Sequence, residues 1–113
     1  MILEECGVLP LNNNKMSKFT ELIKGETPVL VDFYATWCGP CKTMSPILED
    51  VKSQLKGKAK VLKIDVDKNP QASAYYQVRS VPTLILFKKG LQLWRQSGVV
   101  QANQIIQIIN QNV

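Results

Sequence analysis

The sequence Trp37-Cys38-Gly39-Pro40-Cys41-Lys42 places two cysteines between an apolar run and an amphipathic segment. The apolar run from Val29 to Ala35 predicts a buried strand. Downstream, apolar residues recur at helical spacing from Met44 to Leu55, which predicts a helix over residues 40–56. The two cysteines therefore lie where a strand leads into a helix.

The spacing of the cysteines allows them to react with one another. Residues three apart on a helix share a face, so Cys38 and Cys41 can approach closely enough to form a disulfide. Pro40 suits a first helical turn, where its missing N–H removes no hydrogen bond. Cys38 would lie beside the unpaired N–H groups and the positive dipole end of the helix, which favour a thiolate over a thiol. We therefore expect Cys38 to be the more acidic and the more exposed thiol.

A closely spaced cysteine pair is compatible with a structural disulfide, with half of a zinc site, or with a redox-active dithiol. The chain has one further cysteine, Cys6, and no histidine. It therefore lacks both the cysteines of a secreted disulfide scaffold and the ligands to complete a zinc site. The strand–turn–helix context favours the redox dithiol. Cys6 is interpreted as incidental rather than as a third redox centre.

Length and composition indicate one domain with an ordinary core. The net charge is +5, from 14 basic and 9 acidic residues, but the basic residues are scattered and only Lys56 to Lys60 is dense. We therefore predict no binding to nucleic acid. The apolar runs are too short to span a membrane. Met1 to Cys6 carry acidic residues where a secretory signal needs basic ones, so we expect a cytoplasmic protein with no membrane association.

Asp32 lies inside the apolar strand. If that strand is central in a sheet, the carboxylate is buried, its pKa rises, and it becomes a candidate for proton transfer behind the cysteines. If the strand lies at an edge, Asp32 faces water. Lys63 belongs to the alternating run from Val61 to Val66. It is either a solvated strand residue or, beneath a helix, a partner of Asp32.

The remaining segments complete an alternating pattern of helices and strands. A helix beginning at Met16 precedes the first strand, and a short helix follows Asn69-Pro70. Residues 84–87 and 91–96 predict an antiparallel hairpin, and residues 102–109 a final helix. This order predicts an α/β domain with a mixed sheet and helices on both faces. Residues 1–15 show no clear period and are treated as an N-terminal extension to a domain of residues 16–113.

The run from Val31 to Lys42 resembles the active-site signature of the thioredoxin family. The resemblance continues in Pro46, Asp67 to Pro70, Val81 to Leu84 and Gly98, and covers about residues 16–113. It implies the thioredoxin fold and a protein that reduces protein disulfides through Cys38 and Cys41. It also implies re-reduction by a thioredoxin reductase with electrons from NADPH, no bound cofactor or metal, and a monomeric protein.

The resemblance also implies roles for single residues. Cys38 is the nucleophile and Cys41 the resolving thiol, while Asp32 exchanges a proton with Cys41 and has Lys63 as its neighbour. Pro82 takes the cis-proline position that faces the disulfide. The surface that receives client chains is formed by Trp37, Gly39, Pro40, Val81 and Gly98.

Three other classes of function remain to be compared with disulfide reduction. An oxidase or isomerase of the same fold would normally be exported and usually carries histidine between its cysteines. A binding module without activity would be expected to lack one cysteine, yet both are present. A structural subunit of a larger machine stays open as an additional role. One departure from the family pattern is Tyr34, which stands where many thioredoxins have a second tryptophan.

Overall fold

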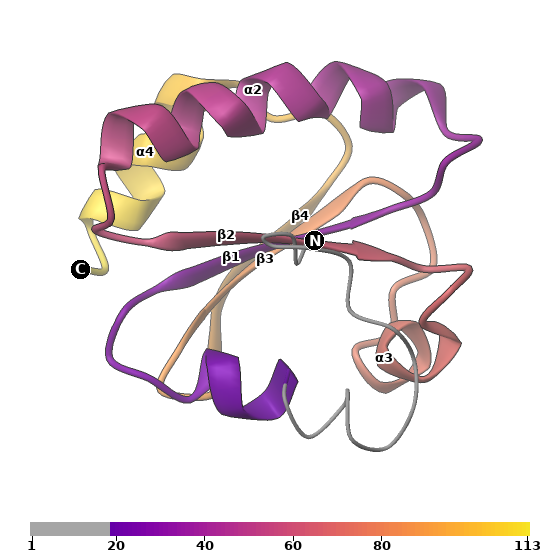
Figure 1. The fold of residues 1–113 in the computed structure, drawn as a ribbon, viewed down its shortest axis with the longest axis horizontal. Helices are drawn as coiled ribbons and strands as arrows, with labels where there is room; N and C mark the ends of the chain where they lie inside the picture. Colours follow the sequence, from indigo (N-terminus) through magenta and orange to yellow (C-terminus); the bar gives the residue numbers. More distant parts are fainter. Residues whose placement is uncertain (1–18) are drawn as a thin grey trace.

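The computed structural model describes residues 19–113 (Figure 1). The predicted extension over residues 1–15, the boundary at Met16, and Cys6 lie outside this part of the chain. Residues 19–23 are helical. The elements that follow are β1 (Val29–Tyr34), α2 (Gly39–Leu55), β2 (Lys60–Asp65), α3 (Pro70–Tyr75), β3 (Thr83–Lys88), β4 (Leu91–Ser97) and α4 (Ala102–Asn110).

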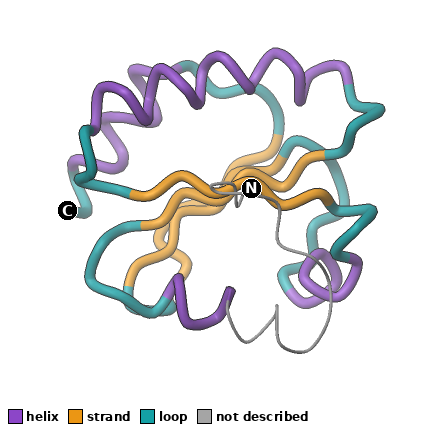
Figure 2. Tube along the Cα trace, in the orientation of Figure 1, coloured by secondary structure: helices purple, strands orange, loops and turns teal. Residues whose placement is uncertain are grey.

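The strands form one sheet (Figure 2). Its strand order is β2-β1-β3-β4. Strand β1 pairs in parallel with β2 and antiparallel with β3, and β3 pairs antiparallel with β4. The predicted hairpin and mixed sheet are both confirmed. Because β1 has a neighbour on each side, it is an interior strand of the sheet.

Helices cover both faces of the sheet, as predicted (Figure 1). Helices α2 and α4 lie over one face, and the helix at residues 19–23 and α3 lie over the other. Alternate residues of β1 point to opposite faces. Val31 and Phe33 therefore pack with Phe19 and Ile23, whereas Leu30 packs with α2 and α4. This alternation places Asp32, two residues from Leu30, on the face that α2 covers.

Helix α2 is held to the sheet by one apolar stripe. Its buried residues Met44, Leu48, Val51 and Leu55 follow the predicted helical spacing. Burying an aliphatic side chain of this size contributes roughly 1.5–3 kcal/mol, so the stripe fixes the helix firmly over the sheet. The helix ends at Leu55, and its C-cap residue Lys56 has a left-handed backbone that leads into Gly57. None of the helices in residues 19–113 is long and apolar enough to cross a membrane.

Candidate active site

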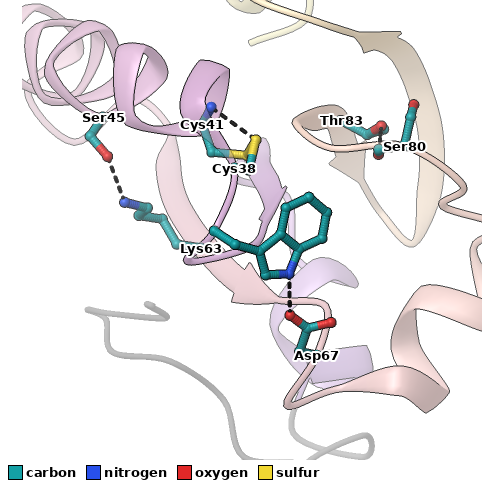
Figure 3. Close-up of a disulfide and its surroundings, with 8 residues drawn as sticks. Cys38, Cys41, Ser45, Lys63, Asp67, Ser80 and Thr83 are labelled. Atoms are coloured by element: carbon teal, nitrogen blue, oxygen red, sulfur yellow. Dashed lines mark hydrogen bonds between the residues drawn. A yellow bond between two sulfur atoms is a disulfide. The ribbon is translucent and has the colours of Figure 1, made fainter.

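The two cysteines form a disulfide at the start of α2 (Figure 3). Cys38 is the N-cap residue, with an extended backbone, and Pro40 lies in the first turn. The Cα atoms of Cys38 and Cys41 are 5.3 Å apart, within the ordinary range for a disulfide. The strand-to-helix position inferred from the sequence is therefore correct.

The sulfur of Cys38 accepts a hydrogen bond from the backbone N–H of Cys41, at 3.1 Å. Serine or aspartate usually supplies this capping contact through oxygen. The sulfur thus lies against one of the unpaired N–H groups at the helix start, where negative charge is favoured. The expected difference in exposure is not seen in this disulfide form, because each cysteine is 4% exposed.

Asp32 is fully buried in the central strand β1, which excludes the alternative of an edge position facing water. Its neighbours in register are Lys63 on β2 and Leu84 on β3. Neither carboxylate oxygen has a hydrogen-bond partner among residues 19–113. Burial raises the pKa of Asp32 from 3.8 to about 7, and the positive charge of Lys63 opposes that rise.

Lys63 is half-buried, and its ammonium group contacts residues other than Asp32 (Figure 3). It donates a hydrogen bond to the hydroxyl of Ser45 on α2, at 3.0 Å, and lies 4.9 Å from the ring centroid of Tyr34. The charge of Lys63 therefore lowers the pKa of Asp32 without a direct hydrogen bond, while Ser45 on α2 holds the ammonium group in place. The sequence interpretation missed Ser45, although its place four residues after Cys41 on the same helix was a usable signal.

Trp37 precedes the disulfide and is 70% exposed. Its indole N–H donates to the Asp67 carboxylate at 2.8 Å, which fixes the exposed ring across the loop that follows β2. Trp37 also lines a small pocket of about 160 Å³. The other lining residues are Val66, which follows β2, and the segment before β3 that consists of Val78, Arg79, Ser80 and Val81. Sequence reasoning did not single out Asp67 as a partner of Trp37.

Val81 and Gly98 are both neighbours of Pro82, the first along the chain and the second through a backbone hydrogen bond. The Val81–Pro82 peptide bond is cis, and Pro82 is buried. The Gly98 N–H donates to the Pro82 carbonyl at 2.9 Å, and Gly98 has φ +91°, a conformation that favours glycine. Val81 packs against the cluster that contains both cysteines. Gly39 and Pro40, between the cysteines, are exposed.

Cysteines, histidines and carboxylates do not gather into a metal-binding group of three anywhere in residues 19–113. The reactive group that the site does contain is the Cys38–Cys41 disulfide. A disulfide at a helix N-terminus, above a sheet that buries a carboxylate, defines a thiol–disulfide oxidoreductase.

Comparison with known proteins agrees with this class. The family model of thioredoxin matches residues 10–111. The chain is 53% identical over 94 residues to a thioredoxin-like protein of Synechocystis sp., covering 82% of this chain and 90% of that protein. It is 45% identical over 103 residues to a thioredoxin of Rickettsia felis, covering 90% of this chain and 98% of that protein.

A solved structure shows the same fold. The X-ray structure of Fasciola hepatica thioredoxin superposes with a TM-score of 0.80 at 29% sequence identity, covering 94% of this chain and 98% of that one. The chain therefore belongs to the thioredoxin family, and the predicted thioredoxin fold is confirmed. It is a thiol–disulfide oxidoreductase whose redox-active pair is Cys38 and Cys41.

Proposed function

We propose that this protein reduces the disulfides of client proteins, with Cys38 as the attacking thiol and Cys41 as the resolving thiol. The observation that carries this assignment is the place of Cys38 at the N-cap of α2, with its sulfur against the Cys41 N–H. After reduction, that N–H and the helix dipole favour a thiolate on Cys38. A lowered thiol pKa is a documented property of thioredoxin itself, and the geometry here acts in the same direction.

The reaction proceeds by two displacements at sulfur. The Cys38 thiolate attacks one sulfur of the client disulfide, forms a mixed disulfide, and releases the other client sulfur as a thiolate that takes up a proton. The Cys41 thiolate then attacks the Cys38 sulfur and releases the second client sulfur, which is also protonated. The client gains two electrons and two protons, and the protein is left with the Cys38–Cys41 disulfide.

Asp32 is the proposed proton acceptor for Cys41 in the second displacement. A carboxyl group with a pKa of about 7 can exist in both protonation states near neutral pH, which suits it to accept and return a proton. Lys63, held by Ser45, is the proposed neighbour that keeps the pKa of Asp32 from rising further. Burial of Asp32 on β1 and the charge of Lys63 on the neighbouring β2, both on the sheet face that α2 covers, support these two roles.

The proposed client surface surrounds the exposed end of the disulfide. Trp37, Gly39 and Pro40 supply its exposed part, and Val81 and Gly98 form the side next to Pro82. A client chain in extended conformation would pair with backbone groups beside Pro82, because β-type pairing takes its affinity from main-chain hydrogen bonds that any sequence can supply. This suits a reductant that acts on many different proteins.

We further propose that NADPH supplies the electrons through a thioredoxin reductase, and that the protein acts as a monomer in the cytoplasm. The assigned activity needs only the two cysteines and the residues around them, so no bound cofactor is invoked. We place that activity in the domain of residues 16–113, with residues 1–15 as an extension.

The test is turnover with insulin as the disulfide substrate. We expect the reduced protein to precipitate the insulin B chain, and NADPH with a thioredoxin reductase to sustain many turnovers. Cys38→Ser should abolish the reaction, whereas Cys41→Ser should accumulate a mixed disulfide with insulin that resolves slowly. Failure of the wild-type protein to reduce insulin, with dithiothreitol as well as with the reductase, would refute the proposal.

A second measurement separates a reductant from an oxidase of the same fold. The purified disulfide form is equilibrated with glutathione buffers of increasing reducing power. We expect the Cys38–Cys41 disulfide to resist reduction by glutathione, as the disulfide of a reductant does. Ready reduction by glutathione would assign the protein to the oxidases instead.

A further inference from the structure

We propose that Arg95 and Ser97 on β4 are positioning residues for client recognition, because they fix the loop that forms one wall of the pocket beside the disulfide. This inference rests on the proposed function, since it concerns how that site receives its client. We call residues Val78, Arg79, Ser80 and Val81 the pocket wall.

The pocket wall is part of the redox site. Its residues line the pocket of about 160 Å³ whose opposite side is formed by Trp37 and Val66. Val66 and Val81 also pack directly against the cluster of both cysteines. A client side chain next to the attacked disulfide would enter this pocket, so the shape of the wall affects how a protein client fits. A small disulfide reagent has no such side chain.

Arg95 holds the start of the pocket wall. One of its guanidinium nitrogens donates to the Tyr76 carbonyl and the other to the Gln77 carbonyl, the latter at 2.7 Å. These carbonyls follow the end of α3, where carbonyl groups lack helical partners and a cation is favourable. Gln77 has φ +53°, a left-handed conformation that turns the chain out of α3 into the wall. Two bonds from one planar group thus fix the turn.

Ser97 holds the end of the pocket wall through Thr83. The Thr83 hydroxyl donates to the Ser80 carbonyl at 2.8 Å and lies 2.9 Å from the Ser97 hydroxyl. A hydroxyl carries one proton, so Thr83 must accept from Ser97 while it donates to Ser80. Ser97 therefore orients the Thr83 hydroxyl toward the wall. Figure 3 shows the Thr83–Ser80 hydrogen bond on the loop to the right of the disulfide.

Arg95 thus holds the chain just before the pocket wall, and Ser97 acts through Thr83 on Ser80 within it. Strand β4 is bonded to β3 along its length, so it is a rigid base from which Arg95 and Ser97 can act. Both side chains are exposed rather than part of the apolar core. Their substitution should therefore change the mobility and shape of the wall while leaving the fold and the cysteines in place.

The first experiment measures hydrogen exchange of backbone amides in Arg95→Met, Arg95→Lys and Ser97→Ala, with Gln96→Met as the control on the same strand. We expect exchange in residues 77–81 to accelerate by roughly tenfold in Arg95→Met, the effect of losing a hydrogen bond to a charged group. The rest of the sheet and the Gln96→Met variant should exchange as the wild type does. Unchanged exchange in the loop would overturn the proposal.

The second experiment compares the rate constants for reduction of insulin and of 5,5′-dithiobis(2-nitrobenzoate). We expect Arg95→Met to lower the insulin rate by roughly fivefold and Ser97→Ala by roughly twofold, with the small-disulfide rate unchanged. Arg95→Lys keeps the charge but loses the planar fork, so its insulin rate should be intermediate.

The outcomes of the second experiment separate the possible causes. Equal losses toward both substrates would mean that the nucleophile had changed, and would overturn the proposal. A wild-type insulin rate in Arg95→Lys would show that charge alone matters, which would also overturn it. Failure of the wild-type protein to reduce either substrate would refute the proposed function instead, and the exchange measurement would still test whether β4 holds the wall.

Discussion

Replacing Asp32 with asparagine tests the most unusual electrostatic feature of the site. Burial raises the pKa of this carboxyl from 3.8 to about 7, against the lowering effect of Lys63. Between those values the folded protein holds a proton that the unfolded chain has released. The stability that this proton contributes is fully present below pH 3.8 and is lost as the pH rises through 7. The asparagine variant has no such group, so this part of its stability does not change with pH.

The size of the effect follows from the difference between the two pKa values. At 1.36 kcal/mol per pKa unit, complete ionisation costs the folded wild type about 4 kcal/mol, and more than half of this stability is lost between pH 5 and pH 8. The unfolding free energy of Asp32→Asn minus that of the wild type should widen by this amount. At pH 5 this difference in unfolding free energy also includes the cost of burying the unpartnered side-chain amide of the variant, which does not change with pH. The test is therefore how much the difference widens between pH 5 and pH 8.

The assay is urea unfolding at pH 5, 6, 7 and 8 with both proteins in the disulfide form, so that neither active-site thiol titrates. Glu49→Gln, at an exposed position of α2, is the control for removing one surface carboxylate, and its gap should not widen comparably. A gap for Asp32→Asn that stays constant over this range would refute the reasoning. It would mean that the buried carboxylate is ionised throughout, and Asp32 could not be the proton acceptor proposed for Cys41.

Two further variants test residues outside the cysteine pair. Cys6→Ser should leave the rate of insulin reduction essentially unchanged, and a loss of more than about tenfold, or 1.4 kcal/mol of barrier, would show that Cys6 takes part. Ser45→Ala removes the hydrogen-bond acceptor of the Lys63 ammonium. Because that ammonium would then stabilise the Asp32 carboxylate less, the pH midpoint of mixed-disulfide resolution should rise, as measured by stopped flow. Thr43→Ala, exposed on the same helix, is the control, and an equal shift there would contradict the role of Ser45.

The sequence predicted the elements of the fold well because their signals are local. Apolar periodicity gave β1 and α2 nearly at their observed bounds, and alternation in β2 correctly separated Leu62 and Ile64 from Val61 and Lys63. The local pattern left Asp32 either buried or facing water at a sheet edge, and only the pairing of β1 with β2 and β3 decides that it is buried.

The contacts that orient the site were not predictable in the same way. Arg95 reaches carbonyls 18 and 19 residues away, and Lys63 reaches Ser45 across 18 residues. Such pairs depend on strand register and on how a helix crosses the sheet, and no short sequence pattern encodes either. The irregular register between Leu86 and Phe87 shifts the pairing along β4, so residue spacing alone could not fix the partners of Arg95.

The fold makes two chemically identical cysteines unequal. Cys38 caps α2 and receives the Cys41 N–H, whereas Cys41 lies one turn further along, inside the helix. The same helix covers the face of β1 that carries Asp32, a carboxyl whose pKa burial raises. Helix α2 thus favours negative charge at its N-cap, Cys38, and by burying Asp32 disfavours negative charge on the strand beneath it. In the proposed mechanism this contrast sets the order of events, because Cys38 is ready to attack while Cys41 must first lose a proton.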